Sequence, residues 1–341
     1  MPVRRLGKGI GAAILASIAA GGAAVSFLAW DWHRPYRRAA GEVRVAVSRG
    51  DRAGDVVEAL HEKGLVSNRV SFKLAFVLYG NPRKLRPGTY RFDRPLSPLE
   101  IIGKLNRGEV ELTRVTIPEG LRADEVIELL AKGGLGSEDA FRRAVQDPRP
   151  ILDLDPRALD LEGYLFPETY LLDPGLSEKA VVLVLVRSFR SWWASAAGPG
   201  RDRGLREVVT LASLVEEETA SAPERPLIAG VFENRLRLGM ALQTDPSVVY
   251  ALSLAGRYSG TLRREDLAFE SPYNTYRHAG LPPGPICSPG RASLEAVLSP
   301  QASPYLYFVS RNDGTHAFSR TLEEHNRWVA RTRRGRSAGG R

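Results

Sequence analysis

Three consecutive glutamates, Glu216, Glu217 and Glu218, end an otherwise apolar stretch of this chain. The segment 205–219 has helical spacing, and at about 100° per residue its apolar side chains share one side. Glu218 projects into that sector, whereas Glu216 points nearly opposite and Glu217 lies at the flank. A carboxyl among apolar neighbours favours its protonated form, as a general acid near neutral pH requires. The alternative is a helix-end glutamate that turns to solvent or caps a neighbouring segment.

Other reactive side chains lack the spacing that their chemistry needs. The five histidines show no metal-ligand spacing. The single cysteine, Cys287, cannot form an internal disulfide, and no catalytic-type histidine is near it in sequence. Ser213 and Ser288 lack the sequence context of a nucleophile elbow. We therefore expect no metal site and no Ser or Cys nucleophile.

An uncharged run of 22 residues, 9–30, lies near the N-terminus. As a helix it would extend about 33 Å, which matches the core of a bilayer. Trp30 and Trp32 suit the membrane interface. The run predicts a single transmembrane helix with residues 1–8 in the cytoplasm and the body exported beyond a linker, 31–41. A cleaved signal peptide is the alternative.

Two stretches offset by 70 residues repeat one pattern, at 45–60 and at 115–130. Each combines a short alternating strand, a glycine turn and an amphipathic helix with an acidic first turn. A third helix is expected at 97–105, where Ser97 can cap the N-terminus. The pattern predicts an N-terminal module of strand and helix units over residues 42–110.

The remainder of the chain predicts a mixed domain, so that the fold class is α+β. Tyr305–Val309 and His316–Phe318 predict two strands joined by a turn at Asn312–Gly314. Residues 242–300 are rich in Pro, Gly, Asn and Tyr and predict a long, structured loop region. Helices are expected at 137–150, 177–195, 205–219, 224–238 and 321–329.

The formal charge of +9 is concentrated at the two ends of the chain. Residues 1–8 carry +3 and residues 331–341 carry +5, which leaves the body nearly neutral. A cationic groove for nucleic acid is therefore not expected. The basic C-terminal segment, 331–341, predicts a disordered tail.

Several segments resemble the YceG-like family, the MltG endolytic murein transglycosylases. Residues 212–220, Ala-Ser-Leu-Val-Glu-Glu-Glu-Thr-Ala, are similar to the catalytic signature of that family. The resemblance extends in order over residues 42–328. Further similar segments are 87–90, 163–167, 231–240, 242–250, 271–276, 280–286 and 305–309.

The resemblance implies one helix in the inner membrane, a LysM-like subdomain at 42–110 and a catalytic domain at 111–330 that cleaves within glycan strands. It places the essential acid at the second Glu of a Glu-x-Glu-Thr sequence, which is Glu218 here. Glu217 stands where relatives can carry a basic residue. One acid suffices in a lytic transglycosylase because the C6 hydroxyl of the substrate attacks the anomeric carbon, leaving a 1,6-anhydro-N-acetylmuramyl end. The resemblance therefore implies that no metal ion and no organic cofactor is required.

Polar side chains in turn-rich segments are candidates for binding the sugar. Amide and hydroxyl groups suit N-acetyl and hydroxyl recognition, and tyrosine rings can stack on sugars. For each residue the alternative is a hydrogen bond that stabilises a loop. The candidates are Asn234, Gln243, Thr244, Asp245, Tyr273, Asn274 and Thr275.

The expected partners are peptidoglycan glycan strands, the membrane and peptidoglycan synthases, because a tethered enzyme would cut nascent strands and set their length. Two other functions remain open from sequence. One is a non-catalytic, glycan-binding scaffold of a cell-wall synthesis complex, in which Glu218 is incidental. The other is a hydrolytic muramidase with Glu162 or Glu168 as the second carboxylate.

Overall fold

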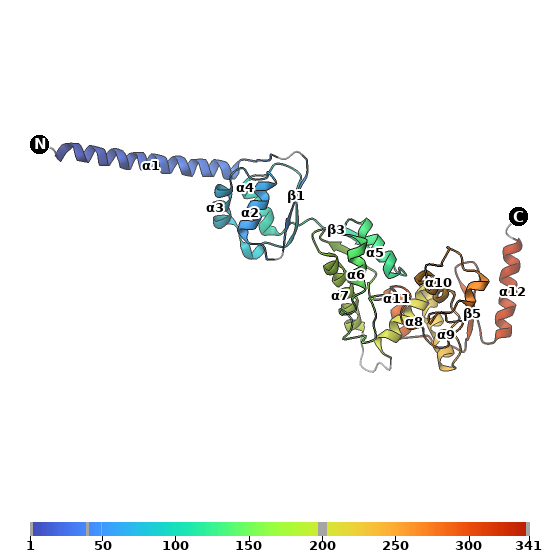
Figure 1. Ribbon diagram of the computed structural model, residues 1–341. Helices are drawn as coiled ribbons and strands as arrows, with labels where there is room; N and C mark the ends of the chain where they lie inside the picture. Colours follow the sequence, from blue (N-terminus) through green and yellow to red (C-terminus); the bar gives the residue numbers. More distant parts are fainter. Residues whose placement is uncertain (1–2, 39–40, 49, 197–202, 339–341) are drawn as a thin grey trace. The chain divides into compact units, whose positions relative to one another are not determined.

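The structure is a computed structural model that describes residues 3–38, 41–48, 50–196 and 203–338, with the backbone alone described at 3–16, 84 and 333–338. The fold is α+β, as predicted, and its described strands form three two-stranded sheets. The chain divides into unit 1, residues 1–113 and 171–176, and unit 2, residues 114–170 and 177–341 (Figure 1).

Unit 1 consists of one long helix followed by a small body of two strands and three helices (Figure 1). Strands β1 and β2 pair antiparallel, with Val45 opposite Tyr90. Its elements are α1 (Val3–His33), β1 (Val43–Val47), α2 (Ala53–Glu62), α3 (Arg69–Tyr79), the 3-10 turn η1 (Pro82–Lys84), β2 (Gly88–Phe92) and α4 (Pro98–Arg107).

The body of unit 1 has its own apolar core. Alternate residues of β1 point inward, and Val45 packs in one cluster with Leu60 of α2, Phe72 of α3 and Ile101 of α4. The predicted cap of α4 is present, because the Ser97 hydroxyl accepts a hydrogen bond from the Glu100 N–H at 3.3 Å. Burial on one face of each helix and a satisfied first turn explain why these short elements are stable together.

Helix α1 covers the whole run that the sequence predicts to span a membrane, and its helical conformation is confirmed. Among the described helices, however, none combines the length and the apolar character that crossing a membrane requires.

Unit 2 is mainly helical. Strand β3 pairs with β4, and β5 with β6, where Val309 lies opposite Ala317. Its elements, with those shared across the unit boundary, are β3 (Thr113–Thr116), α5 (Ala123–Lys132), α6 (Glu138–Val145), β4 (Thr169–Leu172), α7 (Glu178–Ala196), α8 (Leu205–Glu218), η2 (Ala222–Glu224), α9 (Arg225–Arg237), α10 (Asp245–Leu254), η3 (Arg264–Ala268), α11 (Arg291–Leu298), β5 (Tyr307–Ser310), β6 (His316–Ser319) and α12 (Leu322–Ala338).

The repeated strand–glycine–helix pattern is confirmed in both copies. Strand β1 leads to α2 and strand β3 leads to α5. Gly50 and Gly120 both have a positive φ, 103° and 82°, which a residue with a side chain rarely adopts. In the second copy the Arg122 N–H donates to the Glu125 carboxylate at 2.9 Å, which satisfies one of the free donors at the start of α5.

Two predictions for the C-terminal half were wrong. Residues 242–300 are not loops throughout, because α10 and α11 lie within them. Helix α10 begins at Asp245 with Pro246 in its first turn, a position that tolerates the missing N–H. The basic segment is helical as far as Ala338, since α12 continues through it, and residues 339–341 lie outside the described part.

Candidate active site

Helix α8 carries the three consecutive glutamates and lies in the middle of unit 2. It contacts α9, α10 and α11. Residues 208–215 are all buried, so that the helix is covered on every side rather than on one face. The single apolar sector inferred from sequence is therefore incomplete, and side chains on the other faces of α8 also enter the protein interior.

The acids of α8 have three environments, but not the three that were predicted. The Glu216 side chain is only 6% exposed, pairs with Arg225 at 2.9 Å and accepts the Gly290 N–H at 2.8 Å. The prediction that Glu216 points away from the body was wrong, because α9 and α11 cover that side. Glu217 is exposed, as expected from its flank position, and Glu218 is half-buried.

The Glu218 carboxyl is held in a setting that favours its protonated form. The pKa of Glu218 is raised to about 8, chiefly by burial and also by the negative charges of Asp245 and Glu217, while Arg235 acts in the opposite direction. Glu218 is also the last residue of α8, where the negative end of the helix dipole disfavours a carboxylate. A carboxyl with this pKa carries its proton at neutral pH and can donate it.

Glu218 lies where two hollows of unit 2 meet. One hollow, of about 780 Å³, extends from Glu218 past Gln243 and Asp245 to β5, β6 and α12. The other, of about 380 Å³, extends from Glu218 to Glu119 and the end of the β3–α5 loop. A carboxyl that lines both hollows can reach a chain-like ligand that extends from one hollow into the other.

Arg235 of α9 connects two segments that line the larger hollow. The guanidinium is buried, and it donates hydrogen bonds to the carbonyls of Leu306 at 2.6 Å and Leu242 at 2.7 Å. It also lies 5.1 Å from the centre of the Tyr307 ring. These contacts fix the segment before α10 against the start of β5. The positive charge of Arg235 also acts on Glu218 and lowers the pKa of the Glu218 carboxyl.

Sequence reasoning missed Arg235 as a functional residue, although a signal was present. Val231 and Arg235 are four residues apart and therefore share one face of α9. An arginine on a buried face indicates a specific role for its charge. Other lining residues missed from sequence are Tyr276, Tyr307, His316 and His325, which the fold brings to Glu218 from distant segments.

Two of the seven predicted binding residues, Gln243 and Asp245, line the larger hollow with Glu218. Gln243 adopts a positive φ of 53°, and its N–H donates to the Thr275 carbonyl at 3.1 Å. The Asp245 carboxylate accepts a hydrogen bond from the Tyr276 hydroxyl at 2.6 Å. These two side chains are therefore placed to meet a ligand beside the acid.

The other five predicted binding residues support the loops instead of lining that hollow. The Asn234 amide donates to the carbonyls of Ser303 and Tyr305, and the buried Asn274 amide donates to those of Leu267 and Phe269. Thr275 is buried too, and its hydroxyl accepts the Thr244 N–H at 2.9 Å. The Tyr273 ring packs on Tyr250, with ring centres 4.9 Å apart.

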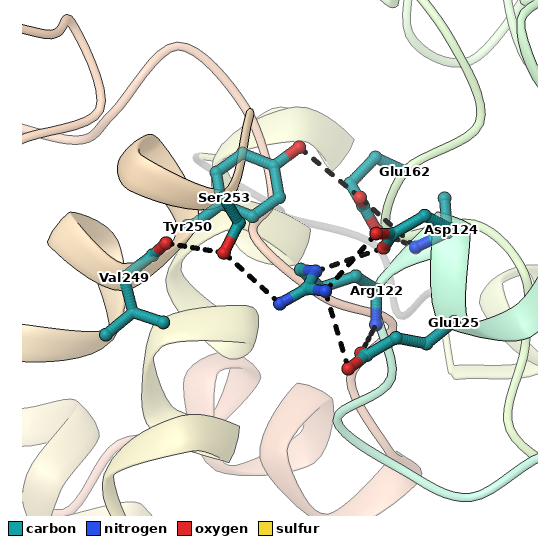
Figure 2. Close-up of polar contacts among 8 residues, drawn as sticks. Arg122, Asp124, Glu125, Glu162, Val249, Tyr250 and Ser253 are labelled. Carbon is teal, nitrogen blue, oxygen red and sulfur yellow. Dashed lines mark hydrogen bonds and ion pairs between the residues drawn. The ribbon is translucent and has the colours of Figure 1, made fainter. Parts of the chain in front are cut away.

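Glu162, one possible partner acid, is buried in a different set of contacts (Figure 2). Its carboxyl accepts the Ala123 N–H at the start of α5 at 3.0 Å and the Tyr250 hydroxyl at 3.3 Å. Burial raises the pKa of Glu162 to about 8. Figure 2 shows Arg122 beside it, with its guanidinium between Ser253 and the acids at the start of α5.

Glu168, the other possible partner acid, accepts a hydrogen bond from the Ser188 hydroxyl at 2.6 Å and lies 3.7 Å from Arg291. Neither Glu162 nor Glu168 lines the two hollows that Glu218 lines. Within the described residues, no group of three or more His, Cys, Asp or Glu side chains is placed to hold a metal ion. Neither Glu162 nor Glu168 is therefore placed to act as a second carboxyl beside Glu218.

The family model described as the YceG-like family matches residues 45–331 of this chain. The chain belongs to the YceG-like family. It is 30% identical over 303 residues to a Bacillus subtilis (strain 168) protein named endolytic murein transglycosylase, covering 84% of this chain and 83% of that protein. A Streptococcus pneumoniae R6 protein of the same name is 31% identical over 324 residues, and the chain spans 58% of its length.

The fold is also similar to a solved structure of a YceG-like protein from Listeria monocytogenes. The TM-score is 0.56 and the sequence identity 30%, over 84% of this chain and 98% of that one. In the present structure several segments that resemble the YceG-like family contact α8, among them those that form α9 and α10. Residues 280–286 lie along this helix, for example, where the Ile286 N–H donates to the Ser213 hydroxyl at 3.1 Å.

Proposed function

We propose that this chain is an endolytic murein transglycosylase, which cleaves the β-1,4 bond between N-acetylmuramic acid and N-acetylglucosamine within peptidoglycan strands. Membership of the YceG-like family and the names of the relatives support the substrate and the reaction class. The observation that carries the proposal is the half-buried Glu218 carboxyl, with its pKa raised to about 8, where two hollows meet.

The proposed mechanism needs one carboxyl in two successive roles. Glu218 donates its proton to the glycosidic oxygen, so that the bond to the anomeric carbon of N-acetylmuramic acid breaks and N-acetylglucosamine leaves with a hydroxyl. The carboxylate then takes the proton of the C6 hydroxyl, whose oxygen bonds to the anomeric carbon. The product is a 1,6-anhydro end, Glu218 regains its proton, and no water is consumed.

The two hollows support cleavage inside a strand rather than at its end. Sugars on one side of the cut would lie in the hollow that contains Arg235 and Tyr307, and those on the other side would lie toward Glu119. Tyrosine faces and charged groups in the lining suit sugar rings and their hydroxyls. A strand that continues past both ends of the site is thus accommodated.

The positions of Glu162 and Glu168 outside both hollows argue against a hydrolytic muramidase that uses either of them as its second carboxyl. Asp245 shares the larger hollow with Glu218, and its carboxylate accepts the Tyr276 hydroxyl at 2.6 Å. The deciding experiment is mass spectrometry of purified peptidoglycan treated with this protein in ¹⁸O-labelled water. We expect anhydro-muramyl ends without label. Labelled reducing ends would instead establish hydrolysis, and intact glycan would favour the binding scaffold.

The reaction is expected to depend on pH through Glu218. The protonated carboxyl is the active form of the free enzyme, so kcat/KM should stay level below the raised pKa of about 8 and fall as pH increases through it. Asp245→Asn removes a negative charge that raises this pKa, and its amide oxygen can still accept the Tyr276 hydroxyl. In Asp245→Asn the alkaline limb of the pH–rate profile, where kcat/KM falls, should therefore move to lower pH.

The measurement is a pH–rate profile for the wild type and Asp245→Asn. Glu265→Gln is the matched control, because its exposed carboxylate pairs with Arg263 and does not line either hollow of Glu218. The control should keep the wild-type profile. An unchanged alkaline limb in Asp245→Asn would show that Asp245 does not set the protonation of Glu218.

We also propose that α1 attaches the chain to the inner membrane, with the body on the outer side. The uncharged run at 9–30 supports this, as does the exposure of Ile18, Val25 and Trp30. An enzyme attached there would meet strands as synthases release them, which is why we include peptidoglycan synthases as partners. Flotation of the full chain with lipid vesicles tests the attachment.

Residues 42–110 are proposed to act as a LysM-like, glycan-binding subdomain. The pair of helices between two antiparallel strands supports this, together with a core separate from that of unit 2. The catalytic domain would then comprise residues 111–330. Retention of the full chain on insoluble peptidoglycan, compared with a chain that lacks residues 42–110, tests this assignment.

A further inference from the structure

Helix α3 exposes an apolar stripe on the surface of unit 1. Val70 is 78% exposed, Leu74 41%, Val77 72% and Leu78 59%. These positions follow the i, i+4, i+7, i+8 spacing of one helix face. Ser71, Phe72, Ala75 and Phe76, on the opposite side of α3, are buried in the body. The helix is therefore apolar on its outer face as well as its inner one.

An outward apolar stripe of this kind marks a surface that another phase or molecule covers. The charged residues around the stripe indicate what covers it. Lys73 and Arg69 lie beside the stripe at about 60° to 100° from Val70 around the helix. An apolar face with a basic edge is typical of helices that lie in the plane of an anionic membrane surface.

Helix α3 contacts the C-terminal end of α1 through side-chain hydrogen bonds and a ring contact. The buried Asp31 carboxylate of α1 accepts hydrogen bonds from the hydroxyls of Ser71 at 2.5 Å and Ser67 at 3.1 Å. The Trp32 indole N–H donates to the Ser71 carbonyl at 3.1 Å, and its ring meets the Tyr79 ring edge-on at 5.8 Å. These contacts hold α3 at a fixed position beside the last turn of α1.

The same junction carries the groups that are enriched at the boundary of lipid and water. Trp30 is 53% exposed, and the Arg34 guanidinium lies 4.6 Å from the centre of its ring. Tyr79, at the end of α3, is 55% exposed. Aromatic rings and basic side chains at one level favour the headgroup region of a bilayer. Figure 1 shows α1 projecting from the side of unit 1 on which α3 lies.

We propose that the stripe formed by Val70, Leu74, Val77 and Leu78 lies in the headgroup region of an anionic membrane. This inference rests on the proposed attachment of α1 to the membrane. The apolar stripe enters the boundary of the acyl chains, and Lys73 meets lipid phosphates, whereas Arg69 stays paired with Glu58 at 2.7 Å. Helix α3 then fixes the orientation of residues 42–110 on the bilayer, where α1 alone would leave them free to rotate.

A fluorophore at position 77 of the full chain tests this proposal. Val77→Cys is labelled with bimane, because the native Cys287 is buried, and the protein is reconstituted into vesicles of phosphatidylethanolamine and phosphatidylglycerol. Nitroxide-bearing lipids should quench the label at least about threefold more than they quench one at Leu159→Cys, and iodide in water should quench it less. Leu159 is the matched control because it is 79% exposed and lies in unit 2.

The possible outcomes separate this proposal from those on which it rests. A chain that fails to float with the vesicles would overturn both the attachment and the role of α3. A chain that floats while iodide reaches position 77 would overturn the role of α3 alone. Protection from iodide without quenching by lipid nitroxides would mean that a protein, such as a second copy, covers the stripe. Cleavage of glycan strands is measured separately and bears on neither result.

Discussion

Glu218→Gln is expected to lower the rate of glycan cleavage about a thousandfold, the scale on which general acid–base catalysis contributes. The amide has nearly the size of the carboxyl, but it cannot donate a proton to the glycosidic oxygen. It fits the same half-buried position at the end of α8, so binding of glycan strands should stay unchanged. Mass spectrometry of the released anhydro-muramyl ends measures the rate, and retention on insoluble peptidoglycan measures the binding.

The neighbouring glutamate provides the matched control. Glu217→Gln changes the same side chain one residue earlier, at an exposed position that lines the smaller hollow but not the larger one. It removes a charge that raises the pKa of Glu218, so a small shift of the pH profile is expected and cleavage should continue. Full activity in Glu218→Gln would show that another group supplies the proton. Equal losses in both variants would point to damage to α8 rather than to a lost acid.

Arg225→Met is expected to lower the free energy of unfolding of unit 2 by about 3 kcal/mol, because it leaves a buried carboxylate without its counter-ion. The Arg225 side chain is 9% exposed and that of Glu216 is 6% exposed, at an N–O distance of 2.9 Å. In the variant Glu216 would keep the Gly290 N–H as its partner and lose the positive charge. Denaturant unfolding followed by circular dichroism measures the change.

Two further variants test the cause. In Arg277→Met the lost pair joins exposed side chains, 52% and 68% exposed, and about 0–1 kcal/mol is expected. Adding Glu216→Gln to Arg225→Met removes the uncompensated charge and should restore part of the stability. If the two arginine variants lose the same stability, the Arg225 pair does not depend on burial. If the added Gln restores nothing, the loss arises from packing of the Arg225 side chain.

Local elements were predictable because the residues that determine them are neighbours in sequence. The β5–β6 hairpin follows from alternating apolar residues around a turn, where Asn312 adopts a φ of 64°. The start of α4 follows from Ser97 and Glu100, three residues apart, whose side chain and backbone groups bond reciprocally. In each case contacts within a few residues provide the stabilisation.

Helix α10 was missed for the opposite reason. Its buried residues include Ser247, Val248, Tyr250 and Ala251, which do not lie on one face. A helix packed on several sides has no apolar period, so its sequence does not distinguish it from a structured loop. Only the neighbouring elements, which cover α10 on more than one side, favour the helix there.

Glu218 could be proposed as the acid from sequence, because the signature at 212–220 and the position of Glu218 at the end of an apolar helix are both local. The surroundings that give Glu218 its function were not. Arg235, Asp245 and Tyr307 come from α9, α10 and β5, up to 89 residues away in the chain. The burial of Glu216 likewise depends on Arg225 and on Gly290. Sequence thus determined the locally stabilised elements and the candidate acid. Tertiary packing decided helix α10, the pKa of Glu218 and the lining of the two hollows, since these depend on groups that only folding brings together.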